Sequence, residues 1–198
     1  MDIVGKMPPA PGQKVFMLVM TDYFLKWIEA LAFKQVTSKE VISFIKRNIL
    51  CKFGVPSETI PRYPQANGQA ESSNKIIINN IKRRLTSCKG KWVEELPWVL
   101  WSDMTTPKTS TGQTPYSLVN GTEVVLPTEI MMPTVRYGLL TTEMNSKELA
   151  HDVDTVDELR EMAIIRLVSY QQRVANTYNK HVHVRAFRVG DFVLRKTF

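Results

Sequence analysis

The feature that most constrains the fold is a continuous apolar run of strand length at residues 15–21, VFMLVMT. A run without polar alternation is typical of a strand that is covered on both faces, so we expect a central strand here. The turn-like segment 22–26, DYFLK, leads into WIEAL at 27–31, which has the pattern of an antiparallel return strand. The sequence therefore predicts a hairpin in the middle of a sheet.

Helix signals follow the hairpin. Thr37 and Glu40 form a capping-box pattern, and Gly54 followed by Pro56 ends the helical stretch. The apolar face of this predicted helix consists of Val41, Phe44, Ile45 and Ile49. After it, Ser57–Ile60 begins as a strand would, but Pro61 interrupts the pattern almost at once.

A second helix is predicted from about Gly68 to Cys88, and a third over 92–101 despite Pro97. The apolar stripe of the second helix is Ile77, Ile81, Leu85 and Cys88, and its opposite face carries Glu71, Lys75, Asn79 and Lys82. Residues 105–115, rich in Thr, Pro and Gly, are expected to form a loop.

The second half of the chain predicts a different organisation. Residues 127–150 show no sustained period and are expected to be a linker, and Thr155 with Glu158 gives a capping box for a long helix over 151–182. The narrow apolar seam of that helix is typical of a packing arm and is compatible with self-association into a homo-oligomer. Its residues are Val156, Leu159, Ala163, Leu167, Tyr170, Val174 and Tyr178. Residues 183–198 contain a turn and the start of a further strand.

Charge and composition favour a nucleic-acid partner. The net charge is +7 and the isoelectric point is near 9.4, with Lys and Arg concentrated in 75–91 and 180–196. No apolar run approaches the ~20 residues of a spanning helix, and no segment has the pattern of a signal peptide, so we expect no membrane partner and an intracellular protein. Cys51 and Cys88 have no metal-ligand spacing around them and are predicted to be free thiols.

One carboxylate stands out at the start of the second helix. In the segment 58–74, ETIPRYPQANGQAESSN, a rigid turning stretch leads directly to Glu71. Phosphodiester chemistry commonly uses two divalent ions held by carboxylates that converge from different elements, and Glu71 is the best candidate for such a ligand. The spacing alone fits an exposed ion pair between Glu71 and Lys75 better than it fits a metal ligand.

Several motifs carry a family resemblance. The segment 63–71, YPQANGQAE, resembles the P-Q-x-N-G-Q-x-E signature that opens the last catalytic helix in integrases of gypsy-class LTR retrotransposons, particularly plant elements. The residues 1–5, MDIVG, resemble the first catalytic strand of that family, and TTPKTSTGQTPY at 105–116 is similar to its T-T-P-x-T-S-T-G-x-T-P segment. The segment 188–191, RVGD, resembles the entry to its small C-terminal barrel.

This resemblance implies an α/β fold, the ribonuclease-H-like mixed sheet flanked by helices, over residues 1–126, followed by the long helix and the start of the barrel. It also implies metal-dependent joining of DNA ends to a target DNA, with Mg²⁺ as cofactor. Carried over by position, the catalytic and metal-binding residues are Asp2 and Glu71, whereas Asp22 matches a non-catalytic position. The implied place of action is the nucleus, although the sequence shows no targeting signal.

The resemblance is interrupted where the family has its second catalytic Asp. That residue belongs to a T/C-D-N-G-x-Q-F motif, and here Glu58-Thr59-Ile60 runs directly into Pro61. We therefore expect an internal deletion near 60/61. Glu58 is the only nearby substitute and sits too early on the interrupted strand.

Three functions remain open at this point. The chain could integrate DNA, could be an inactive nucleic-acid-binding remnant, or could be a fragment without function. The expected DNA-binding residues are Lys75, Lys82, Arg83, Lys89, Arg185 and Arg188. His181 and His183 have no third ligand nearby in sequence and are expected to be solvated or to contact phosphate.

Overall fold

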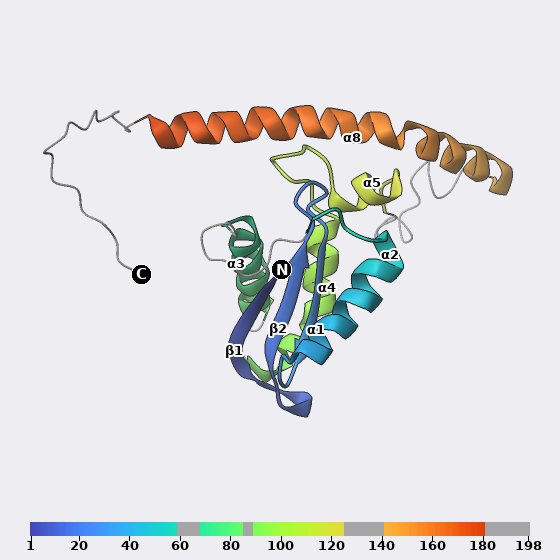
Figure 1. The fold of residues 1–198 in the computed structure, drawn as a ribbon. Coiled ribbons are helices and arrows are strands. Elements are labelled where there is room, and N and C mark those ends of the chain that lie inside the picture. The colour runs from blue at the N-terminus through green and yellow to red at the C-terminus, as the bar shows by residue number, and fades with distance from the viewer. Residues whose placement is uncertain (59–67, 85–88, 125–140, 181–198) are drawn as a thin grey trace, which may run out of the picture.

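The computed structural model describes residues 1–58, 68–84, 89–124 and 141–180. Its sheet has three antiparallel strands in the order β1 (Asp2–Ala10), β2 (Lys14–Thr21) and β3 (Ile28–Phe33). Helices pack around this sheet, and one long helix crosses one end of the body (Figure 1). The described part of the chain is therefore a mixed α/β structure.

The central position of β2 confirms the prediction from the apolar run. Met17, Leu18 and Val19 are all buried, and successive residues of a strand point to opposite faces. Both faces of β2 are therefore covered, which is why the run shows no polar alternation. In the register, Val19 lies opposite Asp2 of β1, and Thr21 lies opposite Ile28 of β3.

The β2–β3 turn is held by Asp22. Its carboxylate Oδ1 accepts hydrogen bonds from the backbone N–H groups of Phe24 (2.9 Å) and Leu25 (2.6 Å), and its own N–H donates to the Trp27 carbonyl at 2.8 Å. Lys26 adopts a left-handed backbone conformation with φ of 60°. Asp22 thus has a local structural role, because its side chain mimics a backbone turn.

The predicted helix after the hairpin is present as three consecutive segments, α1 (Ser38–Phe44), the π-helical η2 (Ile45–Leu50) and α2 (Cys51–Phe53). The capping box is confirmed: Glu40 Oε2 accepts from the N–H of Thr37 at 2.6 Å. The Thr37 hydroxyl donates to the same oxygen at 2.6 Å, and this bond, together with the backbone bond, lowers the pKa of the exposed Glu40 carboxyl. The far end of this helix is fixed to β3 by Lys52, whose Nζ lies 2.8 Å from Glu29 Oε1.

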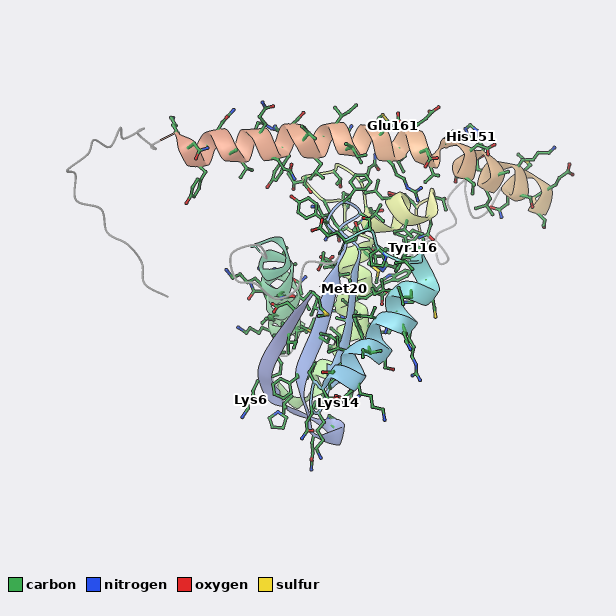
Figure 2. All side chains as sticks on the ribbon, viewed as in Figure 1. Lys6, Lys14, Met20, Tyr116, His151 and Glu161 are labelled. Carbon is green, nitrogen blue, oxygen red and sulfur yellow. The ribbon has the colours of Figure 1, made fainter. Side chains whose placement is uncertain are left out.

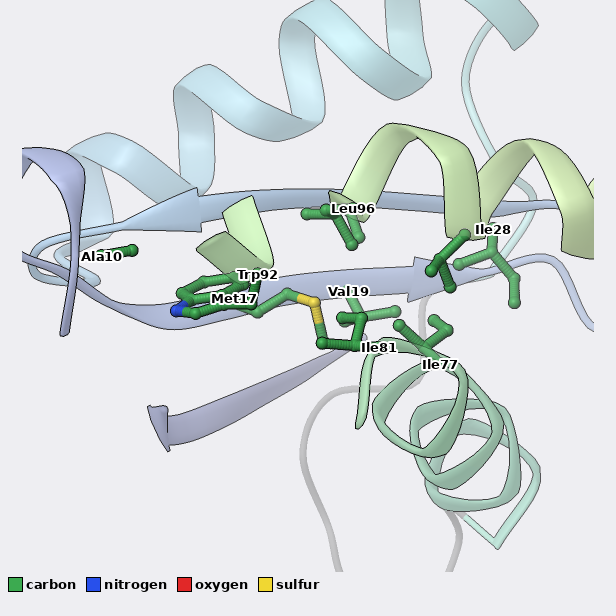
Figure 3. Close-up of a cluster of buried hydrophobic side chains, with 10 residues drawn as sticks. Ala10, Met17, Val19, Ile28, Ile77, Ile81, Trp92 and Leu96 are labelled. Carbon is green, nitrogen blue, oxygen red and sulfur yellow. The ribbon is translucent and has the colours of Figure 1, made fainter. Parts of the chain in front are cut away.

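The main hydrophobic core lies between the sheet and two helices, α3 (Gly68–Arg84) and α4 (Trp92–Met104). Figure 3 shows Ile77 and Ile81 of α3 pointing toward Val19, with Trp92 beside Met17. The other members of the cluster are Ala10, Ile28, Ala30, Leu96 and Val99. The stripe predicted from Ile77 and Ile81 is confirmed, while Leu85 and Cys88 lie outside the described residues.

Trp92 also ties α4 to the far end of β1. Its Nε1 donates to the Pro8 carbonyl at 2.8 Å, which satisfies the indole N–H of a fully buried ring. The third predicted helix is confirmed and continues three residues further than expected, to Met104. Pro97 is tolerated inside it.

A short helix that the sequence analysis did not predict, α5 (Pro115–Asn120), follows the 105–114 loop. Thr114 caps it by accepting from the N–H of Ser117 at 3.0 Å, and Gly121 ends it with φ of 79°. Arg160 of the long helix donates to the carbonyls of Leu118 (2.9 Å) and Val119 (3.3 Å). These bonds satisfy carbonyl groups that the end of α5 leaves without helical partners.

The long helix, α8 (Thr142–Asn179), starts earlier than predicted. Its N-cap is Thr141, whose hydroxyl accepts from the N–H of Met144 at 3.3 Å, so the second part of the 127–150 stretch is helix rather than linker. Thr155, expected as the cap, lies inside α8 and donates to the His151 carbonyl at 3.0 Å. The hydroxyl of a Thr inside a helix can donate to the carbonyl four residues earlier. The Thr155–Glu158 pattern therefore resembles a capping box although Thr155 does not begin the helix.

Along α8, only the middle is packed. Ala163 and Leu167 are buried, whereas every residue from 171 to 180 is exposed. Side chains project from both sides of the helix over most of its length (Figure 2). The predicted seam therefore packs against the body around these two residues, and Val174 and Tyr178 continue it into solvent.

Several expectations fall outside the described residues, namely the interrupted strand beyond Glu58, the segment 59–67 and the barrel start at 183–198. Within the described part the sheet has three antiparallel strands, fewer than the five of the mixed sheet that the resemblance implies. Cys51 is a free, exposed thiol. Among the helices described, none combines the length and apolarity needed to cross a bilayer.

Candidate functional site

The two carboxylates singled out from the sequence belong to adjacent elements. Asp2 is the first residue of β1, where its Oδ1 accepts from the N–H of Ile3 at 2.8 Å. Its Oδ2 accepts from Nδ2 of Asn74 in α3, at 2.5 Å. This bond spans 72 residues of sequence and brings β1 against the first half of α3.

Glu71 lies in the first turn of α3, three residues before Asn74. Residues i and i+3 of a helix share a face, so the backbone of Glu71 belongs to the side of α3 that meets Asp2. The position of the Glu71 side chain lies outside what the structure describes. The fold thus brings Asp2 to a residue one helical turn from Glu71.

Asn74 was not predicted as a site residue. It is only 5% exposed, and its Oδ1 has no hydrogen-bond partner among the described residues. An amide oxygen buried without a partner is costly, so such positions are often tied to a ligand or an ion. The sequence carried one signal for it, since Asn74 follows Glu71 by one helical turn, just beyond the motif.

The described residues do not fit a two-ion magnesium site. Mg²⁺ prefers oxygen ligands in an octahedral arrangement, and a pair of ions needs several converging carboxylates. No group of three or more His, Cys, Asp or Glu side chains that could hold a metal exists in the described part of the chain. Glu58 is exposed and lies in no helix or strand. The Asp22 carboxylate accepts hydrogen bonds from backbone N–H groups within the β2–β3 turn.

The predicted DNA-binding residues are only partly described. Lys75, Lys82 and Arg83 are exposed on α3, on the side away from the core. The side chain of Lys89 and all of Arg185 and Arg188 lie outside the described residues. The described members of the predicted DNA-binding set therefore all lie on α3.

A pocket that the sequence analysis missed lies between α3 and α4. It is lined by Asn80, Arg83 and Arg84 of α3 and by Val99 and Ser102 of α4. Arg84 Nη1 lies 3.0 Å from Glu95 Oε2 of α4, so this arginine bridges the two helices. The signal available in sequence was the i, i+3 and i+4 spacing of three polar residues on one helix face.

Comparison with known proteins gives relatives of one kind. The chain is 27% identical over 143 residues to a Gag-Pol polyprotein of avian reticuloendotheliosis virus, with 59% of this chain and 12% of the relative covered. It is 30% identical over 142 residues to a Gag-Pol polyprotein of gibbon ape leukemia virus, with 58% of this chain and 8% of the relative covered. It is 28% identical over 148 residues to a Pol polyprotein of radiation murine leukemia virus (strain Kaplan), with 61% of this chain and 25% of the relative covered.

These matches show similarity to a pol region of the retroviral type. The chain spans a quarter or less of the length of each of these relatives. No protein-family model matches it.

The alignments are longer than the part of this chain that they use. For the avian virus, 59% of a 198-residue chain is about 117 residues, yet the alignment extends over 143, a surplus of about 26 positions. For the murine virus, 61% of this chain is about 121 residues, yet the alignment extends over 148 positions, which is a surplus of about 27 positions. The relatives therefore carry residues, within the matched region, that have no counterpart here.

Proposed function

We propose that this chain derives from the catalytic core of a gypsy-class retrotransposon integrase, that it binds nucleic acid, and that it does not join DNA ends. The observation that carries the proposal is the hydrogen bond between Asp2 Oδ2 and Asn74 Nδ2. It joins Asp2 to a residue one helical turn from Glu71, and this proximity supports the pairing of the two carboxylates that a ribonuclease-H-like site would use.

The similarity to retroviral pol regions supports this origin independently of the motifs. The surplus of about 26 to 27 aligned positions in the relatives supports an internal deletion in this chain. We assign the deletion to the point after Ile60, where the Asp motif is missing.

The loss of catalysis follows from counting ligands. Asp2 and Glu71 together can provide protein ligands to one divalent ion, whereas two-ion chemistry must stabilise both the attacking and the leaving oxygen. The hydrogen bond from Asn74 also occupies one oxygen of Asp2. In this proposal, Asp2 and Glu71 therefore bind one Mg²⁺ ion weakly and not two.

Nucleic-acid binding does not depend on that site. Lys75, Lys82 and Arg83 are exposed on α3, and the net charge of the chain is +7. Cations that neutralise phosphates release condensed counterions, which gives affinity without reading sequence. Action in the nucleus and self-association along the exposed part of α8 remain parts of the proposal.

The test of catalysis is joining of a labelled DNA end to a plasmid in the presence of magnesium or manganese. The unmodified chain should give no joined product. A chain repaired with the missing strand and its Asp should regain activity, and Glu71→Gln in that chain should remove it. Metal-dependent joining by the unmodified chain that disappears in Glu71→Gln would contradict the proposed inactivity.

The test of binding is a titration of a fluorescein-labelled DNA duplex at several salt concentrations. Log affinity should fall with log salt by about 0.9 per phosphate neutralised. The triple variant Lys75→Gln, Lys82→Gln, Arg83→Gln should weaken binding of all duplex sequences alike. Affinity that does not change with salt would remove the electrostatic basis of the proposal.

A further inference from the structure

The pocket between α3 and α4 has the composition of an anion site. Its volume is about 200 Å³, several times the ~30 Å³ share of one water molecule in the liquid. Its lining combines two guanidinium groups, one amide and one hydroxyl around the buried side chain of Val99. All of these polar groups can donate hydrogen bonds, and none is a carboxylate.

Helix geometry explains why the lining residues meet. Asn80, Arg83 and Arg84 are separated by three and four positions on α3, and Val99 and Ser102 by three on α4. Residues at these spacings share a face. The two faces meet because Ile81 and Val99 belong to the same core cluster, which fixes the distance between the helices.

The two arginines have different surroundings. Arg84 is paired with Glu95 at 3.0 Å, which holds its guanidinium at the pocket while neutralising much of its charge. Arg83 is exposed and makes no ion pair or hydrogen bond with any other described residue. Arg83 is therefore the group that brings net positive charge to the pocket.

We propose that this pocket binds one phosphodiester group of a nucleic-acid strand, held by the Arg83 guanidinium and by the polar groups of Asn80 and Ser102. The inference rests on the proposed function and adds a defined contact to its diffuse basic surface. The planar fork of a guanidinium matches two phosphate oxygens at once, which a lysine cannot do.

The position of the pocket on α3 favours a strand over an isolated anion. Lys75, Lys82 and Arg83 extend along roughly 12 Å of the helix at 1.5 Å per residue. One strand of a duplex presents a phosphate every ~3.4 Å along the axis, so this distance corresponds to about three to four intervals between successive phosphates. Lys75 and Lys82 lie on a different face of α3 from Asn80, and Arg83, which belongs both to the basic surface and to the pocket lining, is the residue through which a strand bound at that surface would reach the pocket.

The experiment uses the full chain, a fluorescein-labelled DNA duplex and variants that leave the net charge unchanged. Asn80→Ala and Ser102→Ala should each lower affinity about 3- to 10-fold, the effect of losing one hydrogen bond, with the salt slope unchanged. Arg83→Lys should lower affinity by a similar factor although the charge is kept. Asn79→Ala, an exposed change on the same helix, is the matched control and should have no effect.

The failures of the two proposals differ. If Lys75→Gln weakens binding while Asn80→Ala, Ser102→Ala and Arg83→Lys do not, the basic surface is real and the pocket inference is wrong. If the unmodified chain does not bind the duplex at low salt, the proposed function and the inference both fail. Stronger binding to phosphatidylserine vesicles than to the duplex, with the same dependence on Asn80, would replace the nucleic-acid strand by a lipid headgroup and overturn the inference. Circular dichroism melts of each variant verify that the fold is intact.

Discussion

Asn74 Nδ2 donates to Asp2 Oδ2 at 2.5 Å, and this single side-chain bond joins the start of β1 to the first half of α3. The donor side chain is almost fully buried, so the bond forms where water cannot compete for it. It is the structural link on which the proposed relationship between Asp2 and Glu71 depends.

Asn74→Ala should lower the free energy of unfolding by about 1–3 kcal/mol, because it removes a buried donor and leaves the Asp2 carboxylate with one bond fewer. Asn79→Ala, an exposed Asn on the same helix, should stay within ~0.5 kcal/mol of the parent. Urea denaturation measures both. Adding Asp2→Ala to form a double-mutant cycle should give a coupling of about 0.5–3 kcal/mol, and additive losses would show that the two residues do not interact.

Core packing is tested by two isoleucines of α3. Ile81 is 1% exposed and Ile76 is 46% exposed. Ile81→Ala should cost about 2–5 kcal/mol, since it leaves a cavity between α3 and β2, whereas Ile76→Ala should cost well under half of that. Thermal and urea unfolding are the measurements. Equal losses would mean that α3 does not pack with its Ile77 and Ile81 side toward the sheet.

The attachment of α8 depends on Arg160. Arg160→Met keeps most of the aliphatic length but removes the hydrogen bonds to the carbonyls of Leu118 and Val119. Amide hydrogen exchange in α5 and in the middle of α8 should become about 10-fold faster or more, consistent with bonds from a charged donor that contribute about 1.5–3 kcal/mol. Arg173→Met, an exposed change on the same helix, should leave exchange in α5 as it is.

The hairpin turn should give a pH-dependent stability. Burial lowers the pKa of Lys26 to about 8 from its ordinary 10.5, while the Asp22 carboxylate acts in the opposite direction. Between these two values the unfolded chain binds more protons than the folded chain, so stability from this group rises with pH across that window and is lowest below about 8.

Lys26→Met should remove that rise. The measurement is urea denaturation of parent and variant on either side of the window, and the difference between them should shrink as pH increases. Lys75→Met, which removes an exposed lysine from α3, should keep the pH dependence of the parent. A constant difference between the parent and Lys26→Met across the window would show that Lys26 is not desolvated.

The elements that sequence predicted correctly are those with local signals. The run around Leu18 identifies a doubly covered strand because a buried strand needs no polar face, and the Thr37–Glu40 pair starts a helix by direct contact over three residues. The start of α8 was missed because the same kind of Thr pattern occurs at Thr155, where the hydroxyl bonds back to His151 inside the helix.

The site was predicted only in part for a different reason. Asp2 and Glu71 came from motif positions, but no local pattern shows that Asp2 meets Asn74, since their contact is created by packing α3 against the sheet. The α3–α4 pocket has the same origin, because Asn80 and Ser102 face each other only once Ile81 and Val99 are buried together.

The length of α8 and the straight course of its C-terminal part have a geometric consequence for anything joined after Lys180 (Figure 1). From Arg160, where the helix is held to α5, to Lys180 is roughly 30 Å at 1.5 Å per residue. Each residue also turns the helix by about 100°, so α8 sets a direction as well as a distance. Inserting one residue between these points would add only ~1.5 Å but would swing the following chain by more than a quarter turn, whereas a four-residue insertion would nearly restore the original heading at a longer reach.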